Sequence, residues 1–229
     1  MYFSRIQINP RRREAMKLLS SPRAMHAAVE SAFPPDRGES DEGRVLWRID
    51  ADQHDVRLYV VSPHQPDLRH LAEQAGWETS PGEHIDYRPF LDGLQVGQRF
   101  GFRVTVNPVK RDFVKGGRGR LVPLVGATQL DWFVQRSAGW GFRVRPMGLP
   151  EEIGTEASAE RLDLQAERQR SWTFGKDQHG RRFDVTQHHT TLTGRLEVTE
   201  ATALRQALVR GMGRGKAYGC GLMTLARAR

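Results

Sequence analysis

The segment Gln98-Arg-Phe-Gly-Phe-Arg-Val-Thr-Val-Asn-Pro108 decides how this chain of 229 residues is organised. Its apolar side chains alternate with small or polar ones, which is the period of a β-strand, and Asn107-Pro108 ends the run. The chain begins with the same design, because the alternating segment Tyr2–Ile8 ends at Asn9-Pro10. Two strands of one design, each followed by helical and further strand-like segments, predict two units built on the same plan.

The first unit is expected to have the element order β-α-β-β-α-β. Residues 11–33 have helical periodicity, which Pro22 interrupts. Proline fits the first position of a helix, so a second helix is expected to begin there, capped by Ser20 or Ser21. The remaining elements are expected as strands at 45–50, 56–62 and 85–91 and a short helix at 66–75. This order is the ferredoxin-like plan.

The second unit is expected to repeat this order with additional elements. The two units share an order of elements but no similarity in sequence. Strands are expected at 98–106, 141–147, 185–198 and 222–226, and helices at 123–138 and 200–210. A loop is expected at 150–160, an extended or irregular segment at 162–173, and a hairpin with a basic tip at 174–185. The predicted fold class is α+β, with two tandem ferredoxin-like (βαββαβ) domains at 1–92 and 98–229.

The charge balance favours an anionic partner. The chain has 35 Lys and Arg residues against 27 Asp and Glu residues, a net charge of +8 and a sequence pI near 10.2. Arginine holds phosphate in a bidentate manner and stacks on bases, so a nucleic acid is expected. The single cysteine, Cys220, is expected to be packed rather than reactive, and it indicates a reducing, cytoplasmic setting. Without a long apolar run or a secretory signal, no membrane partner is expected.

The C-terminal stretch Gly211-Met-Gly-Arg-Gly-Lys-Ala-Tyr-Gly-Cys-Gly221 is the strongest sign of phosphate binding. Its glycines let the backbone take positive φ and lie close to a ligand, and Arg214 and Lys216 stand among them. The same glycines are compatible with a plain turn before a final strand. The stretch lacks the order of a P-loop or a dinucleotide-binding fingerprint, so it points to a polyanion rather than a mononucleotide.

The side chains suit RNA cleavage by the 2′-hydroxyl of the RNA itself. No zinc-protease, EF-hand, nucleophile-elbow or Walker pattern occurs, and no metal and no cofactor are expected. The 2′-hydroxyl route needs a base, an acid and cations, and histidine supplies the first two near neutral pH. Among eight histidines, His26 stands at the edge of a helix whose buried face holds Met25, Val29 and Phe33. On helix position alone, a surface or packing role for His26 is the simpler interpretation.

Several segments together resemble one family from end to end of the chain. They are Met1-Tyr-Phe-Ser-Arg-Ile6, Met25-His26, Leu46-Trp-Arg48, the FRxxxNPxK strand from Phe102 to Lys110, Gly194-Arg-Leu-Glu-Val198 and the glycine-rich tail. The combination of the FRxxxNPxK strand with that tail is specific. It is similar to the CasE family, the CRISPR RNA-processing endoribonucleases of type I-E systems.

The resemblance implies binding of the stem-loop of a CRISPR repeat by two ferredoxin-like domains. It implies a single metal-independent cut at the 3′ base of the stem, retention of the product, and assembly with other Cascade subunits. His26 matches the family's catalytic histidine, and Lys216 with Gly213 and Gly215 matches its glycine-rich loop. The hairpin at 174–185 resembles the element that enters the major groove of the stem. The other residues expected to contact RNA are Lys110, Arg111, Lys115, Lys176, Arg181, Arg182 and Arg214.

One position departs from the family, whose tyrosine three residues before the histidine is replaced here by Arg23. Residues i and i+3 share a helix face, so Arg23 can stabilise phosphorane charge beside His26, although it is a poor base. A plain solvated arginine is the other interpretation. Tyr2 is a candidate for the missing role, because the first strand is expected beside this helix. Two alternatives stay open: a repeat-RNA clamp with little or no cleavage, and a general RNA-binding protein.

Overall fold

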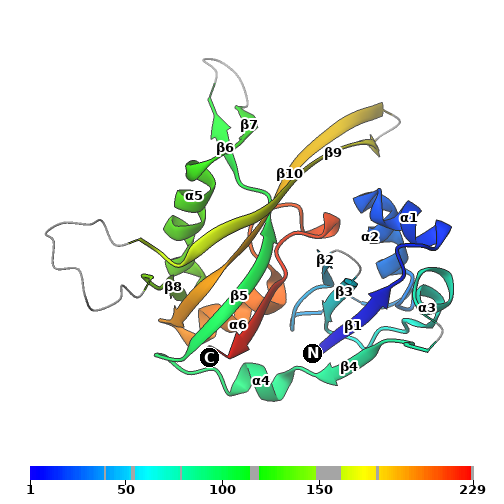
Figure 1. The fold of residues 1–229 in the computed structure, drawn as a ribbon, viewed down its shortest axis with the longest axis horizontal. Helices are drawn as coiled ribbons and strands as arrows, with labels where there is room; N and C mark the ends of the chain where they lie inside the picture. Colours follow the sequence, from blue (N-terminus) through cyan, green and yellow to red (C-terminus); the bar gives the residue numbers. More distant parts are fainter. Residues whose placement is uncertain are drawn as a thin grey trace, which may run out of the picture.

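The computed structural model describes residues 1–38, 40–52, 55–77, 79–113, 119–147, 161–178 and 181–227, with side chains except at 176–178 and 181–184. Two antiparallel sheets lie side by side (Figure 1). The first has the strand order β2-β3-β1-β4. Its strands are β1 (Tyr2–Ile8), β2 (Leu46–Asp52), β3 (Asp55–Ser62) and β4 (Glu83–Asp86), and its helices are α1 (Arg13–Leu19), α2 (Pro22–Glu30) and α3 (Arg69–Ala75).

Pro22 separates α1 from α2, as the sequence predicts. It holds the first helical position of α2, where a missing N–H costs nothing. The hydroxyl oxygen of Ser21 accepts a hydrogen bond from the backbone N–H of Ala24 at 3.2 Å, so the cap is confirmed at Ser21. Met25 and Val29 are buried in the core that α2 shares with the first sheet. The cap and this buried stripe fix the helix and leave His26 at the edge of the stripe.

The final strand of the first unit is confirmed, but its predicted range of 85–91 is wrong beyond Asp86. The fourth strand of the first sheet ends at Asp86, and the next residues form a short helix, α4 (Arg88–Asp92). Pro89 has no N–H to donate to a strand ladder and instead fits the first turn of this helix. Tyr87 and Leu91, one turn apart, are both buried in the core shared with the second unit. Tertiary packing therefore determines that this segment is helical rather than extended.

The second sheet has the order β11-β5-β10-β8, with β9 paired to β10. Its strands are β5 (Arg99–Val106), β8 (Phe142–Val144), β9 (Leu164–Gln178), β10 (Arg181–Val198) and β11 (Met223–Arg227), and its helices are α5 (Ala127–Ser137) and α6 (Ala201–Arg210). The segment 162–173 is thus mostly regular strand. A separate two-stranded ribbon, β6 (Val109–Asp112) with β7 (Arg120–Pro123), projects from this unit (Figure 1). The loop expected at 150–160 lies outside the described residues.

Both sheets have the same topology. When β9 is set aside, the strands of each unit, counted along the chain, lie in the order fourth-first-third-second. This order with two helical crossovers is the ferredoxin-like arrangement, and the α+β fold class with two such units is confirmed. The division into domains at 1–92 and 98–229 stays a prediction. In the described part of the chain, no helix is long and apolar enough to cross a membrane.

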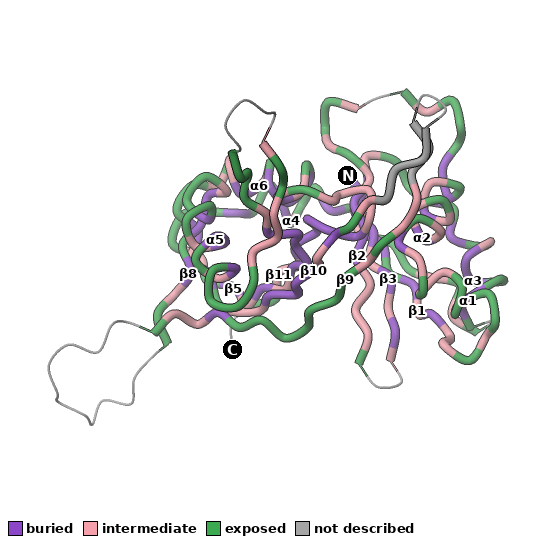
Figure 2. Tube along the Cα trace, turned by 90° about the horizontal axis from the view of Figure 1, so that it is seen from above, coloured by how far each residue is buried: buried purple, intermediate pink, exposed green. Residues whose placement is uncertain are grey.

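Arg48 joins the two units. Its side chain is 1% exposed, and its guanidinium donates to the carbonyl oxygens of Arg103 (2.6 Å) and Leu222 (2.9 Å) in the second unit. It also donates to Thr224 Oγ1 at 2.8 Å and forms a two-bond ion pair with Asp50 of its own strand. Buried residues run through both units in Figure 2. The fold therefore fixes the second unit against β2, the strand that supports the site described next.

Candidate active site

His26 lies on α2 at the edge of the first unit's core. Its side chain is 34% exposed, but its Nδ1 atom is buried and has no hydrogen-bond partner within the described ranges. The ring therefore reaches solvent through its other atoms. Oε1 of Glu30, one helical turn further along, is 3.8 Å from Nδ1. This carboxylate favours the tautomer with the proton on Nδ1, which leaves the lone pair on Nε2.

The glycine-rich tail brings a turn of the second unit to His26. This turn, η2 (Lys216–Tyr218), is bounded by Gly215 at φ 81° and Gly219 at φ 87°, a backbone conformation that other residues rarely adopt. A Cβ on Gly219 would lie 2.7 Å from the ring of Trp47 on β2. The fold itself therefore requires glycine at these positions, because the turn is tight, packs against the first unit and leads into the last strand.

Tyr218 is the side chain of this turn that meets His26. The two ring centroids are 6.2 Å apart, with the planes at 66°. Tyr218 also packs against Phe174 of β9, with the two ring centroids 4.6 Å apart. Arg23, on α2, also reaches β9, because its Nη1 donates to the carbonyl oxygen of Gly175 at 2.9 Å. The site is thus assembled from α2 of the first unit and from η2 and β9 of the second.

Burial and nearby positive charges favour the neutral form of His26. Burial is the main cause that lowers the pKa of His26 below 6.5, Glu30 opposes the shift, and Arg44 and Arg37 add to it. Burial also lowers the pKa of Lys216, and Arg44 contributes to that shift too. Arg37 forms an ion pair with Glu30, and its guanidinium lies 4.3 Å from the centroid of the Phe33 ring. A base that is neutral at pH 7 can therefore stand in a field that attracts a phosphate.

The two other predicted catalytic residues are placed differently from each other. Arg23 lies one turn before His26 on α2, but its guanidinium is engaged with β9. Tyr2 is half-buried on β1, where it pairs with Ser62 and Asp86, and no described contact joins it to His26. Roles for Arg23 and Tyr2 in catalysis stay predictions.

The predicted RNA-contacting residues spread over three places. Lys110 and Arg111 are exposed on β6 of the projecting ribbon, and Lys115 lies outside the described residues. The backbone of Lys176, Arg181 and Arg182 belongs to the β9–β10 hairpin, as the sequence predicts, but their side chains lie outside the description. Arg214 is exposed in the tail, where Gly213, at φ 71°, lies against Trp132 and Gly215 precedes Lys216. Cys220 is buried, and burial raises the pKa of its thiol.

Sequence reasoning missed Tyr218 and Arg44. Tyr218 stands inside the glycine-rich tail, whose glycines and cations are the features that indicate phosphate binding. Arg44 sits in a loop far from Lys216 in sequence, yet its charge acts on both His26 and Lys216. An aromatic residue between two glycines of a cationic loop was the available signal for Tyr218. No local signal marks Arg44. Among the described residues, His, Cys, Asp and Glu form no group of three that could hold a metal ion.

The chain matches known proteins over nearly its whole length. The family model described as "CRISPR associated protein" matches residues 1–227. The chain is 29% identical over 229 residues to the CRISPR-associated endoribonuclease Cse3 of Thermus thermophilus, which covers 99% of this chain and 100% of that protein. A structure of CRISPR endoribonuclease Cse3 bound to 19 nt RNA superposes with a TM-score of 0.76 at 25% identity, covering 99% of this chain and 100% of the other. A Thermus thermophilus Cse3 structure with an RNA representing a pre-cleavage complex gives 0.73 at 25% identity, covering 98% of each chain.

Proposed function

The chain belongs to the family of CRISPR-associated proteins, and from this membership we propose that it is an endoribonuclease that processes precursor CRISPR RNA. It binds the stem-loop of the repeat and cuts once at the 3′ base of the stem. The observation that carries the proposal is the meeting of His26 with Tyr218 and the Lys216 loop across the two units. The likeness to the RNA-bound Cse3 structures supports it.

The cleavage is an internal displacement at phosphorus. Nε2 of neutral His26 takes the proton of the 2′-hydroxyl, whose oxygen bonds to the adjacent phosphorus while the bond from phosphorus to the 5′-oxygen breaks. Lys216 and Arg44 stabilise the charge that develops on the phosphoryl oxygens. Tyr218, whose ring meets His26, gives a proton to the leaving 5′-oxygen. The products are a 2′,3′-cyclic phosphate and a 5′-hydroxyl, and the reaction requires no metal ion.

Binding rests on charge and on the hairpin. The net charge of +8 favours a polyanion, and the β9–β10 hairpin carries the basic residues proposed to enter the major groove of the stem. The protein keeps its product and acts in the cytoplasm as a subunit of Cascade.

A second candidate function is a repeat-RNA clamp that cuts slowly or not at all. The observation that favours it is Arg23, which holds the place of the family's tyrosine and donates to Gly175 instead of to His26. Both functions share the RNA and differ in the product.

Matched RNAs separate the candidates. The wild-type protein is incubated in excess with a repeat hairpin and with an unrelated stem of equal length. We expect tighter binding and one cut for the repeat alone, slower cutting by Tyr218→Phe and unchanged binding by that variant. A bound but uncut repeat at every protein excess would establish the clamp, and equal binding of both stems would rule out repeat recognition.

A further inference from the structure

A pocket between the two units adjoins the candidate active site. It is called the Trp172 pocket here, and its walls include Leu19, Met25 and Trp47 of the first unit and Arg168, Arg170 and Trp172 of β9. Tyr218 lines it as well, so one side chain belongs both to this pocket and to the contact with His26. The cavity volume is about 180 Å³, smaller than the ~300–1,000 Å³ typical of sites for drug-sized ligands. This size suits one planar ring system.

The wall that β9 provides is a stacking surface. The guanidinium carbon of Arg170 lies 3.8 Å from the centroid of the Trp172 ring, and His189 meets that ring edge-on with the centroids 6.4 Å apart. Burial lowers the pKa of His189 to about 4, so this imidazole is neutral and adds no charge at pH 7. Indole rings and arginine planes are the surfaces on which proteins stack unpaired bases.

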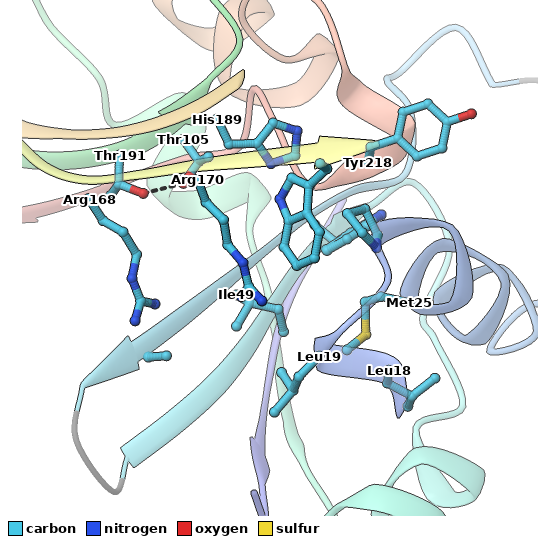
Figure 3. A pocket seen from close by; sticks show the side chains of 15 residues that line it. Leu18, Leu19, Met25, Ile49, Thr105, Arg168, Arg170, His189, Thr191 and Tyr218 are labelled. Atoms are coloured by element: carbon cyan, nitrogen blue, oxygen red, sulfur yellow. Dashed lines mark hydrogen bonds between the residues drawn. The ribbon is translucent and has the colours of Figure 1, made fainter. Parts of the chain in front are cut away.

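The pocket also carries positive charge that the protein leaves unpaired. Arg168 and Arg170 extend from β9 toward the first unit (Figure 3), and neither has an ion-pair partner among the described residues. Arg103, by contrast, is paired with both Asp50 and Glu167. Two unpaired guanidinium groups beside an apolar slot match a nucleotide, whose base is flat and apolar on its faces and whose phosphate is anionic.

One face of β9 connects the pocket with the active site. Arg168, Arg170, Trp172 and Phe174 are alternate residues of a continuous pairing with β10, so their side chains point to the same side. The stripe begins at the pocket and ends where Phe174 packs against Tyr218. Residues 165–171 of β9 are exposed, and this part of β9 is green in Figure 2. The stripe therefore joins the Trp172 pocket to Tyr218, the residue that contacts His26.

We propose that the Trp172 pocket binds the first unpaired nucleotide on the 3′ side of the cut, with its base stacked at Trp172 and Arg170 and a phosphate at Arg168. The inference rests on the proposed function. The nucleotide on the 5′ side of the cut belongs to the stem and is held by base pairing, so the downstream nucleotide is the one free to leave the stack. Held in this way, it fixes the leaving 5′-oxygen next to Tyr218 and His26.

Two RNAs and two tryptophan variants test the pocket. One RNA ends at the cut, and the other carries a short unpaired 3′ flank, with a 2′-deoxy nucleotide at the cut so that it stays whole. Affinities of both are measured for wild type, Trp172→Ala and the matched control Trp77→Ala, an exposed tryptophan outside the pocket. We expect the flank to tighten wild-type binding by roughly 5- to 150-fold, as one base stack does, and Trp172→Ala alone to remove this gain.

A fluorescent base gives a second measurement. 2-Aminopurine in the first flanking position should lose fluorescence on binding to wild type and to Trp77→Ala, and should lose much less with Trp172→Ala or with Arg168→Gln/Arg170→Gln. Unchanged affinity of Trp172→Ala and Trp77→Ala for the RNA that ends at the cut shows that fold and stem recognition are intact. A flank that adds no affinity, or a gain that survives Trp172→Ala, overturns the pocket proposal while the proposed function stands. Loss of binding to other Cascade subunits, with the flank gain intact, would make the pocket a protein-docking site. Absence of repeat binding altogether would overturn both proposals.

Discussion

Replacing Gly219 with alanine should weaken the protein by disturbing the turn that carries Tyr218 and Lys216. At φ 87°, an alanine costs roughly 1–2 kcal/mol. The added Cβ would lie 2.7 Å from the ring of Trp47, whose side chain is buried, and overpacking of this kind costs roughly 1–3 kcal/mol. The free energy of unfolding should therefore fall by about 2–5 kcal/mol.

Two further glycines divide this cost into its parts. Gly97 has φ 85°, but a Cβ there meets nothing within 4 Å, so Gly97→Ala should show the backbone cost alone. Gly139 lies in a 3-10 turn, has ordinary φ and equally open surroundings, so Gly139→Ala should be neutral or slightly stabilising. The measurement is urea unfolding followed by tryptophan fluorescence, together with single-turnover cleavage under conditions where all variants are folded. Cleavage should fall for Gly219→Ala alone. If Gly219→Ala is no less stable than Gly97→Ala and cuts at the wild-type rate, the turn is not held by Trp47 as described.

Three other changes test separate parts of the molecule. Arg48→Met should lower the free energy of unfolding by roughly 2–4 kcal/mol in urea, because it leaves two carbonyl oxygens without this donor, while Asp50 keeps Arg103 as a partner. A loss within about 0.5 kcal/mol would mean that the junction is not held there. Because burial lowers the pKa of His26 below 6.5, the loss of cleavage at low pH should have its midpoint below pH 6.5, and a midpoint at or above 6.5 would contradict this. Arg44→Gln removes a nearby positive charge, so it should raise that pKa and move the drop to higher pH, and an unmoved profile would exclude the coupling.

The fold was predictable where local chemistry decides it. Ser21 and Pro22 specify the start of α2 through a cap and a fixed φ, and the alternation in Tyr2–Ile8 and at 98–106 specifies the first strand of each unit. The segment 85–91 was not predictable in this way, because its apolar residues fit a strand as well as a helical turn. Burial of Tyr87 and Leu91 against the second unit decides between them.

The candidate site was predictable only in part, for a similar reason. His26 and Lys216 stand in recognisable local patterns, but the contact of His26 with Tyr218 and the effect of Arg44 arise from the docking of two units. Arg48 shows the difficulty most clearly. An arginine in an alternating strand is normally a surface residue, whereas here it is buried because the second unit supplies its carbonyl partners. Sequence periodicity carries no information about such a junction.

The role of His26 as catalytic base is tested by a single-turnover reaction of wild type and His26→Ala with the cognate repeat RNA in EDTA, resolved on a denaturing gel. The wild type should produce one cut that ends in a cyclic phosphate. His26→Ala should bind the repeat equally well and cut roughly 100- to 10,000-fold more slowly, which is the usual loss for a general base. Cutting by His26→Ala at the wild-type rate, or no cut by the wild type while the RNA stays bound, would contradict the assignment of His26 as the catalytic base.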